Sequence, residues 1–214
     1  MTEKISIQTS ASSKNDQVAA ENRTFFQKNG LLTLNLISSA GSGKTSLLEV
    51  MAKRYGKSLA VITGDIQMTY DADRITQAGS LAVQIETHGT CHLTAAMVQD
   101  KLKEMDLKEV KLLVIENIGN LVCPSTYDLG EKFKIALVST AEGDEKPIKY
   151  PALFLRASVV MITKIDLMPY VNFNLERVKS DCLKLNPNAR LMTTSCKTGE
   201  GLDEWFGYLQ GLMA

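Results

Sequence analysis

The fold is decided by residues 31–45, LLTLNLISSAGSGKT. An apolar run (31–37) leads into a loop of small residues that ends in lysine and threonine, and a helix-forming segment, SLLEVMAKRY (46–55), follows. Glycines in such a loop let the backbone approach a ligand, and successive N–H groups ahead of a helix N-terminus bind phosphate oxygens. The order of strand, loop and helix therefore predicts a phosphate-binding loop.

The polar side chains of this loop predict contacts to a nucleoside triphosphate. Lys44 is expected to reach the β- and γ-phosphates, and the Thr45 hydroxyl is expected to ligate Mg²⁺. The usual pattern begins with glycine, whereas this loop begins with Ser38, so the prediction depends on the strand–loop–helix setting as much as on the motif. The alternative is a Gly/Ser turn with a surface lysine. The loop residues predicted to bind nucleotide are Gly41, Ser42, Gly43, Lys44, Thr45 and Ser46.

Outside the loop, short apolar runs alternate with segments of helical periodicity. Near-continuous apolar strands indicate burial on both faces, as in parallel sheets. The alternation predicts an α/β P-loop NTPase with a mostly parallel, doubly wound sheet and ligands at the carboxyl ends of its strands. The predicted strands are 31–37, 58–63, 81–86, 111–116, 134–139, 158–163 and 190–194. The predicted helices are 43–55, 71–78, 92–105, 148–157, 174–185 and 201–212.

Composition limits the organisation of the chain and its partners. One globular domain is expected over residues 30–214, preceded by a flexible polar arm over 1–29 with a short helix around 18–26. Basic and acidic side chains balance at 24 each, which gives no reason to expect nucleic acid or a membrane as partner. With no run of about 18 apolar residues, no signal-peptide pattern and no disulfide framework among its cysteines, the chain is expected to be cytoplasmic.

Two carboxylates end predicted strands near the phosphate loop. Glu116 ends LLVIE, and Asp65 ends the segment TGD. At that edge of the sheet a carboxylate can hold a water of the Mg²⁺ shell or orient the attacking water. The predicted catalytic residues are therefore Lys44, Asp65 and Glu116. The residues predicted to hold Mg²⁺ are Thr45, Asp65 and Glu116. The backbone N–H of Gly119 is predicted to contact the γ-phosphate. The alternative for each carboxylate is a solvated loop position.

Two later loops predict which base is bound. The carboxylate of Asp166, in TKID (163–166), can accept hydrogen bonds from guanine N1–H and N2–H₂ together, a pair of donors that adenine lacks. The stem of Lys164 is expected to lie along the base. Ser195, Cys196 and Lys197 resemble a guanine-binding loop, although Cys196 takes the place of an alanine. Thr163 stands where Asn is usual and predicts a weaker tie to the rest of the site; ordinary polar loops with ATP as ligand are the alternative.

A thiol and an imidazole adjoin in GTCHL (89–93), and a further thiol, Cys123, follows Glu116 closely. Cys91 lies near the predicted start of a helix, where the pKa of a thiol is expected to be lowered. The spacing matches no standard metal motif. From the residues alone, structural thiols and a metal site formed by Cys91, His92 and Cys123 both remain open. His88 is expected to be a loop or packing residue.

The combination of motifs resembles the nickel-incorporation GTPases of nickel–iron hydrogenase maturation, the HypB family. The segments that carry the resemblance are SSAGSGKT (38–45), GTCHL (89–93), ENIGNLVCP (116–124), TAEGDEKPIKYP (140–151) and TKIDLMPYV (163–171). The resemblance implies a SIMIBI-type GTPase fold, a GTP-dependent homodimer, and Ni²⁺ or Zn²⁺ bound at the subunit interface by Cys91, His92 and Cys123. Residues 1–30 contain neither Cys nor His, so the nickel store of some family members is not expected.

The function implied by the resemblance is delivery of nickel by a GTP-hydrolysing metallochaperone with slow turnover. Its cofactors and cargo would be GTP, Mg²⁺ and Ni²⁺ or Zn²⁺, and its partners a HypA-like nickel chaperone and the hydrogenase large-subunit precursor. Lys146 is a candidate contact to the nucleotide of the second subunit, or else a surface ion pair. The alternatives are a urease- or cobalamin-type metallochaperone GTPase, a GTP-gated scaffold with structural zinc, and a small-molecule phosphotransferase.

Overall fold

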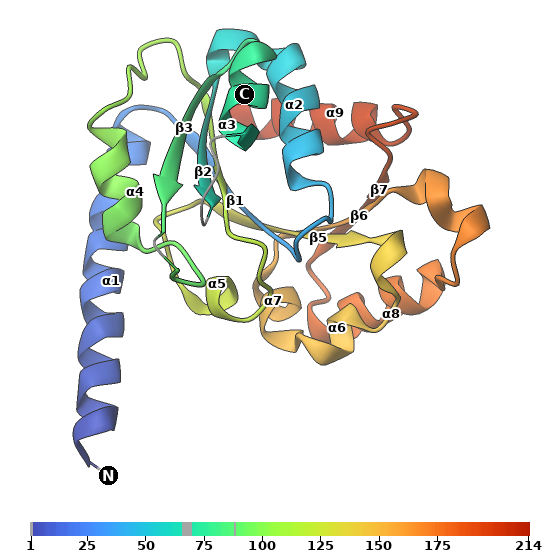
Figure 1. Ribbon diagram of the computed structural model, residues 1–214, viewed down its shortest axis with the longest axis horizontal. Helices are drawn as coiled ribbons and strands as arrows, with labels where there is room; N and C mark the ends of the chain where they lie inside the picture. The colour runs from blue at the N-terminus through green and yellow to red at the C-terminus, as the bar shows by residue number, and fades with distance from the viewer. Residues whose placement is uncertain (1, 66–69, 88) are drawn as a thin grey trace.

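The computed structural model describes residues 2–65, 70–87 and 89–214, with the side chains of 2–12, 65 and 70 outside the description. Over these residues the core is a single parallel sheet in the order β3-β2-β4-β1-β5-β6-β7 (Figure 1). The predicted α/β fold is confirmed, and each predicted strand overlaps an observed one. The strands are β1 (Leu32–Ile37), β2 (Leu59–Asp65), β3 (Leu81–Glu86), β4 (Leu112–Glu116), β5 (Phe133–Ser139), β6 (Val159–Thr163) and β7 (Arg190–Thr194).

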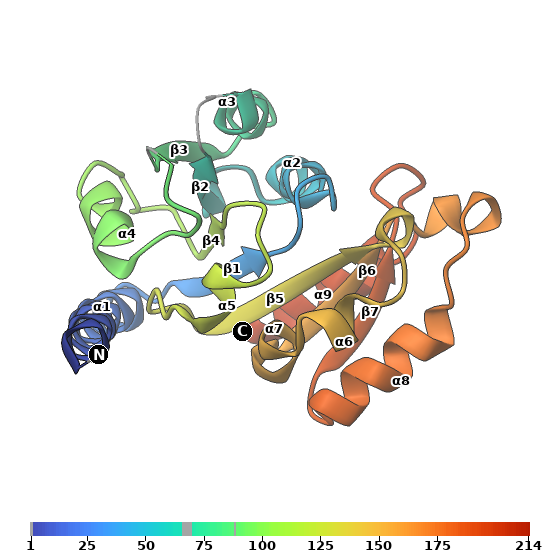
Figure 2. The ribbon, with the colours of Figure 1, turned by 60° about the horizontal axis from the view of Figure 1, so that its bottom comes forward.

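Helices cover both faces of the sheet, as a doubly wound fold requires (Figures 1 and 2). One face carries α2, α3 and α9, and the other carries α1, α4, α7 and α8. The helices are α1 (Thr2–Lys28), α2 (Lys44–Tyr55), α3 (Tyr70–Gln77), α4 (Ala95–Leu102), α5 (Cys123–Thr126), α6 (Lys146–Lys149), α7 (Pro151–Arg156), α8 (Leu175–Leu185) and α9 (Leu202–Met213), with short 3₁₀ turns at Gly56–Ser58, Thr140–Glu142 and Ile165–Tyr170.

The two faces divide the apolar residues of each strand between them. In β2, Leu59 and Val61 contribute to the core beneath α2 and α9, whereas Ala60 and Ile62 contribute to the core beneath α1 and α4. Consecutive residues of a strand point to opposite faces, so only a strand buried on both sides needs the continuous apolar runs that the sequence contains.

The strand order reverses around β1, which pairs with β4 on one side and with β5 on the other. In such folds the crevice at the carboxyl ends of these strands binds the ligand. The register places Glu116 of β4 opposite Leu36 of β1 and Thr63 of β2. On the other side of β1, Thr163 of β6 lies level with Ser139 and Thr194. The residues predicted to bind phosphate and base therefore share one edge of the sheet.

The N-terminal segment differs from the flexible arm that was predicted over 1–29. Residues 2–28 form one helix, α1, which packs on α4 and is much longer than the short helix expected at 18–26. Ala19, Asn22 and Phe26 are buried on one side of it. The helix was missed because its apolar stripe is narrow and its buried polar residue has partners far away in the sequence. Among the described residues, no helix combines the length and apolar character needed to span a bilayer.

Two predicted helices have different bounds in the structure. The helix predicted at 148–157 is divided at Tyr150 into α6 and α7, because Pro151 has no N–H to continue a helix and instead begins the second one. The helix predicted at 92–105 begins at Ala95, where the side chain of Thr94 caps it by accepting from the Met97 amide. Cys91 and His92 therefore lie in the loop that precedes α4.

Candidate nucleotide and metal sites

The phosphate loop joins β1 to α2 through two glycines of positive φ. Gly41 has a φ of 76° and Gly43 a φ of 96°, which other residues rarely adopt. Lys44 begins α2, is buried, and its Nζ donates to Ser38 Oγ over 3.0 Å. The Thr45 hydroxyl donates to Oε1 of Glu116 over 3.0 Å. The loop and the predicted catalytic carboxylate are thus in direct contact.

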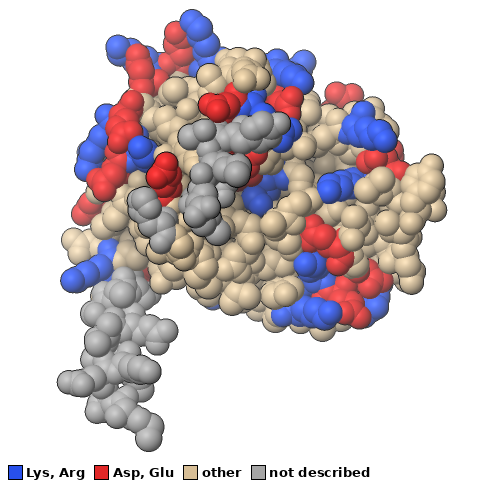
Figure 3. Space-filling model, viewed as in Figure 1, with Lys and Arg blue, Asp and Glu red and all other residues tan. Residues whose placement is uncertain are grey.

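A cavity of about 340 Å³ lies over the loop and is lined by Lys44, Thr45 and Glu116 together with the backbone at Gly119. A Cβ added at Gly119 would lie only 2.8 Å from the Ala40 amide nitrogen, so this position tolerates only glycine. In the view of Figure 3, basic side chains are visible near the centre of the molecular surface, and acidic and basic groups intermingle around them. The cavity has the donors and the shape for a phosphate chain.

Asp65 is placed only in part. Its backbone ends β2 opposite Glu86, just beyond the level at which Thr63 faces Glu116. The side chain lies outside the described residues, as does His88, so the predicted catalytic and magnesium roles of Asp65 stay predictions.

The predicted base loops converge beside the phosphate loop. The Ser195 hydroxyl donates to Oδ1 of Asp166 over 2.6 Å. Lys164 has a φ of 58° and donates from Nζ to the Gly41 carbonyl over 2.7 Å, so its stem lies along the loop. A cavity of about 330 Å³ is bounded by Gly43, Ser46, Thr163, Lys164, Asp166, Leu167, Cys196 and Lys197. It shares Gly43, Ser46 and Lys164 with the phosphate cavity, so one nucleotide can span both.

Two details of the base site concern its departures from the usual pattern. Thr163 Oγ1 donates to the Ser42 carbonyl over 2.7 Å and is buried, so the hydroxyl does tie the base loop to the phosphate loop. Burial raises the pKa of Cys196 to about 11, with the carboxylates of Asp166 and Glu49 adding to the effect. The thiol therefore stays neutral at physiological pH and can lie against a base without adding charge.

The segment of Lys146, which the sequence suggested as a contact to the nucleotide of a second subunit or as a surface ion pair, also holds the phosphate loop of its own chain. Glu142 accepts from the Ser42 hydroxyl over 2.5 Å. Lys146 pairs with Glu142 at 3.3 Å and donates to the Ser39 hydroxyl over 3.0 Å. Lys146 thus forms the ion pair considered for it, within its own chain. The conspicuous EGDEKP motif (142–147) was a signal for this contact, but sequence cannot show which loop it touches.

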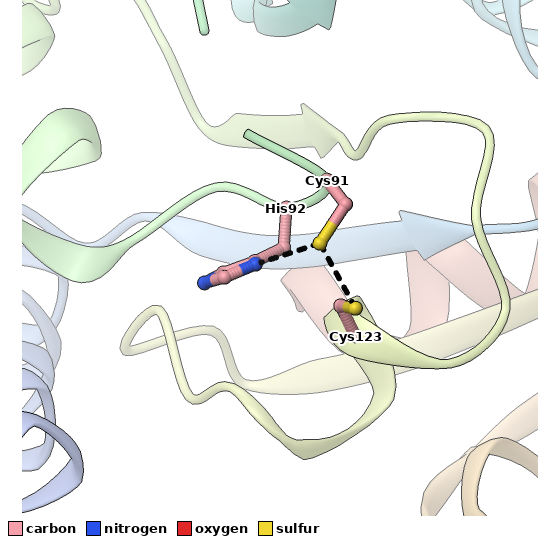
Figure 4. Close-up of side chains that lie close together, drawn as sticks. All are labelled: Cys91, His92 and Cys123. Atoms are coloured by element: carbon pink, nitrogen blue, oxygen red, sulfur yellow. Dashed lines mark hydrogen bonds between the residues drawn. The ribbon is translucent and has the colours of Figure 1, made fainter. Parts of the chain in front are cut away.

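The structure brings Cys91, His92 and Cys123 together. Their ligand atoms all lie within 4.8 Å of one another. Cys91 Sγ is 2.9 Å from Cys123 Sγ and 3.5 Å from His92 Nδ1, and Figure 4 shows the three side chains converging from two separate segments. Cys91 is exposed, and the other two are half-buried. Two thiols and an imidazole suit Ni²⁺ and Zn²⁺ alike.

The protonation of this cluster differs from the expectation for Cys91. Its pKa is raised, chiefly by the hydrogen bond with the Cys123 thiol and further by desolvation. The predicted lowering fails because α4 begins only at Ala95, so the helix N-terminus does not reach the sulfur. Burial lowers the pKa of His92, which leaves the imidazole neutral at pH 7 and free to act as a ligand.

Two neighbours of the cluster were not found from sequence. The ring of Tyr127 lies against the His92 ring, with centroids 3.8 Å apart and planes inclined by 32°. Asn120 donates from Nδ2 to the Cys91 carbonyl over 3.1 Å. Contacts of this kind orient a ligand before a metal arrives. Tyr127 follows Cys123 closely in the chain, but only the fold shows that its ring reaches His92.

A buried polar network runs from the edge of the nucleotide site to both metal-bearing segments. Asn117 follows Glu116, accepts from the Leu93 amide over 3.4 Å and donates to Asn35 over 3.2 Å. Asn35 donates to Glu131 over 3.2 Å, and Glu131 accepts from the Leu129 amide over 2.7 Å. Leu93 follows His92, and Leu129 lies in the loop after Cys123. The network therefore links the two sites through buried side chains.

Comparisons with known proteins agree with this geometry. The family model described as the nucleotide-binding domain of CobW/HypB/UreG proteins matches residues 32–193. The hydrogenase maturation factor HypB of Escherichia coli (strain K12) is 44% identical over 199 residues, which are 92% of this chain and 69% of that protein. The chain belongs to the HypB family. The hydrogenase/urease maturation factor HypB of Helicobacter pylori (strain 26695) is likewise 44% identical, over 92% of this chain and 83% of that protein.

Solved HypB structures share the fold almost throughout. HypB from Helicobacter pylori in complex with nickel superposes with a TM-score of 0.89 at 43% identity, covering 94% of this chain and 95% of that one. HypB from Archaeoglobus fulgidus gives 0.88 at 35% identity, covering 94% and 100%. The chain thus shares the P-loop nucleotide-binding domain of the HypB family in fold as well as in sequence.

Proposed function

We propose that this chain is a GTP-hydrolysing metallochaperone that delivers nickel during maturation of nickel–iron hydrogenase and switches by GTP-dependent dimerisation. The observation that carries the proposal is the placement of Glu116 and Cys123 in one short segment, ENIGNLVC (116–123). Its first residue contacts Thr45 of the phosphate loop, and its last lies 2.9 Å from the Cys91 sulfur. A change at the γ-phosphate therefore has a short path to the thiols.

The nucleotide chemistry follows from the geometry of the loop. Lys44 and the loop amides neutralise the charge that develops on the phosphates, and Glu116 orients the attacking water. Mg²⁺ held by Thr45 and Glu116, with Asp65, would supply Lewis-acid polarisation of the phosphate oxygens. Ser195 holds the Asp166 carboxylate in place. There the carboxylate accepts two hydrogen bonds from guanine, whereas adenine offers no matching pair of N–H donors. GTP is therefore expected to bind at least about 100-fold more tightly than ATP, and a competition assay that favours ATP contradicts the assignment.

The thiol–imidazole cluster is suited to cargo that must leave again. Cys91, His92 and Cys123 offer three ligands, whereas structural zinc sites are closed by four. Cys91 is exposed, so a receiving protein can approach it. The relative from Helicobacter pylori was solved with nickel, which favours Ni²⁺ as the cargo of this chain too. A HypA-like nickel chaperone as donor and the hydrogenase large-subunit precursor as acceptor complete the proposal.

Exposed apolar side chains near the cluster support pairing of two subunits there. Val122 is 58% exposed beside Cys123, Ile148 of α6 is 56% exposed and Leu155 of α7 is 51% exposed. Helix α7 packs against both α5 and α6, so these side chains come from neighbouring elements. In the proposed cycle GTP favours the pair, and hydrolysis loosens it so that nickel passes to the acceptor.

The fraction of dimer tests this switch. Analytical ultracentrifugation of the full chain with Ni²⁺ is expected to give mostly dimer with a non-hydrolysable GTP analogue and mostly monomer with GDP. Val122→Asp should abolish the difference, whereas Leu183→Asp, which changes an exposed apolar side chain on α8, should leave it intact. Equal dimer fractions with the two nucleotides in the unmodified chain contradict GTP-dependent dimerisation.

A further inference from the structure

The two segments that carry the metal ligands are joined by asparagines of α1. One segment leads into α4 and carries Cys91 and His92, and the other, called the loop 123–131, begins with Cys123 and includes the single-turn helix α5. Asn15 accepts from the Ala95 amide over 2.9 Å through its oxygen and donates to the Asp128 carbonyl over 2.8 Å through its nitrogen. One side chain of the N-terminal helix thus spans the gap between the segments.

Asn22 repeats this bridge two turns further along α1. Its Nδ2 donates to the Ala95 carbonyl over 2.9 Å and to the Leu129 carbonyl over 3.1 Å, and the residue is 1% exposed. Its Oδ1 is buried and has no hydrogen-bond partner among the described residues. A buried polar oxygen without a partner costs free energy of folding. The contribution of Asn22 to the contact therefore comes from its amide N–H donors and not from Oδ1. Both bridges meet at Ala95, the first residue of α4.

Close backbone packing fixes the same contact from the side of the loop. A Cβ at Gly130 would lie 2.7 Å from the Ala19 carbonyl oxygen and 2.7 Å from Asn22 Cβ, so loop and helix approach as closely as glycine permits. Arg23 adds two hydrogen bonds to the carboxylate of Asp128, of 2.9 and 2.7 Å. The loop is therefore held against α1 at successive residues.

We infer that Asn15 and Asn22 are positioning residues for the metal site: by bridging the start of α4 to the loop 123–131 they set the separation of Cys91 and His92 from Cys123. The inference rests on the proposed metal-binding role of these three residues. Neither asparagine touches the ligands. They act on the two backbones from which the ligands project, so their loss should loosen the cluster without altering its donor atoms.

The test compares the full chain with Asn15→Ala, Asn22→Ala and the double variant. The matched control is Asn29→Ala, because Asn29 lies just beyond α1 and donates only to the Phe25 carbonyl of that helix. Titration with Co²⁺ and Ni²⁺ gives the affinity, and the thiolate-to-cobalt absorption reports the coordination. The double variant is expected to lose about 10-fold or more in affinity, the usual range for groups that orient metal ligands, with a changed cobalt spectrum. GDP affinity should stay within about two-fold, and Asn29→Ala should match the unmodified chain.

A second readout needs no metal. The rate at which the azo oxidant diamide joins Cys91 to Cys123, followed by peptide mass spectrometry, depends on how often the two sulfurs meet. The double variant should form this disulfide several-fold more slowly. If Asn22→Ala fails to fold, the half-buried Asn15→Ala carries both measurements. Unchanged metal affinity together with an unchanged oxidation rate overturns the inference. If the unmodified chain binds neither metal, the proposed function fails, and the oxidation rate still decides the inference alone.

Discussion

The nucleotide site and the metal site of this chain are built in different ways. The nucleotide site consists of loops at the carboxyl ends of adjacent strands, and its parts are joined within a few residues of the sheet: Thr45 to Glu116, Thr163 to Ser42, Lys164 to Gly41. The metal site consists of side chains on two outer segments, held by polar groups from α1 and by the network through Asn35 and Asn117.

This difference predicts how each site responds to change. The geometry of the nucleotide site is set by a buried sheet. Nucleotide binding should therefore be insensitive to substitutions at the periphery and should be lost only when residues of the site itself are changed. The geometry of the metal site is set by contacts between segments that are distant in the sequence. Metal affinity should therefore be sensitive to substitutions of residues that do not touch the metal. A substitution in one site should leave binding in the other largely intact while the substituted site is empty, because the two sites are coupled through their bound ligands.

The largest effect is expected at the phosphate loop. Lys44→Ala removes the cation at the phosphates and should reduce GTP turnover by about 10²–10³-fold, as loss of a preorganised electrostatic group does. Phosphate release under single-turnover conditions measures it. Measured without nucleotide, the Ni²⁺ affinity of the variant should remain within about two-fold of the unmodified chain; a large loss of nickel affinity under that condition would show that Lys44 also supports the metal site directly.

The corresponding change in the metal site is Cys123→Ala. Removing one of three ligands should weaken Ni²⁺ binding by more than about 100-fold, beyond the 10–100-fold range of indirect contacts. Competition with a chromophoric chelator gives the affinity. Cys182→Ala is the matched control, because Cys182 is a buried thiol in α8 whose pKa burial raises to about 12. Equal nickel affinity in Cys123→Ala and the unmodified chain removes the metal assignment.

The hydrogen-bond network between the two sites can be tested by removing Asn35, its central member. Asn35→Leu fills a similar space but leaves the Asn117 amide nitrogen without its buried acceptor and removes one donor from Glu131, which should lower the free energy of unfolding by about 1–3 kcal/mol. Urea denaturation measures this loss. Any effect of the bound nucleotide on nickel affinity should shrink in the same variant, and a fully preserved effect would show that the coupling takes another route.

A smaller effect is expected for the tie between base loop and phosphate loop. Thr163→Val keeps the shape of the side chain but removes the donor to the Ser42 carbonyl. The expected loss in unfolding free energy is about 1 kcal/mol, the net value of one hydrogen bond, with weaker GDP binding by isothermal calorimetry and unchanged Ni²⁺ binding. Unchanged GDP affinity would mean that the tie serves the fold alone.

The smallest effect concerns the ion pair of α1 with the metal-bearing loop. Burial acts to raise the pKa of Asp128, but the bonds from Arg23 and the Gly130 amide outweigh it and lower the pKa below its usual value. A carboxylate with a lowered folded-state pKa stabilises the protein above the unfolded pKa of about 4, and that contribution is lost as pH falls through the folded value.

Because the pair is about 40% exposed, Arg23→Ala should cost only about 0.5 kcal/mol at pH 7. The cost should shrink at an acidic pH well below the ordinary carboxyl pKa of about 4, as Asp128 becomes protonated in the folded protein too. Urea denaturation at both pH values checks this, and an equal cost at both would assign the loss to the packing of the arginine stem.

The fold and much of the candidate site could be predicted because their signals are local. LLTLNLI (31–37) and GSGKT (41–45) adjoin in the chain, so strand, loop and helix can be read from one stretch. Asp166 and Ser195 were both predicted for the base site because each follows the end of a predictable strand, and the structure brings the two side chains into contact. The metal site of Cys91, His92 and Cys123 was predicted through resemblance, since the spacing alone favoured structural thiols.

The rest depends on contacts that sequence does not display. Asn15 and Asn22 look like residues of a polar arm until α4 and the loop 123–131 supply their partners. Thr163 keeps a hydroxyl in place of the usual amide, and only the fold shows that this hydroxyl reaches the Ser42 carbonyl; the weaker tie expected from the missing amide stays a prediction. The lowered pKa expected for Cys91 depended on a helix start that Thr94 shifts to Ala95, and on ignoring the Cys123 thiol that tertiary structure brings next to it.

The central claim is that the nucleotide state controls the metal site. It is tested most directly by the Ni²⁺ affinity of the full chain, measured by chelator competition with GDP and with a non-hydrolysable GTP analogue at saturating Mg²⁺. The account predicts that nickel binds at least about 5-fold more tightly with the GTP analogue, a coupling in the usual range for linked sites. Equal affinities in the two nucleotide states would contradict it.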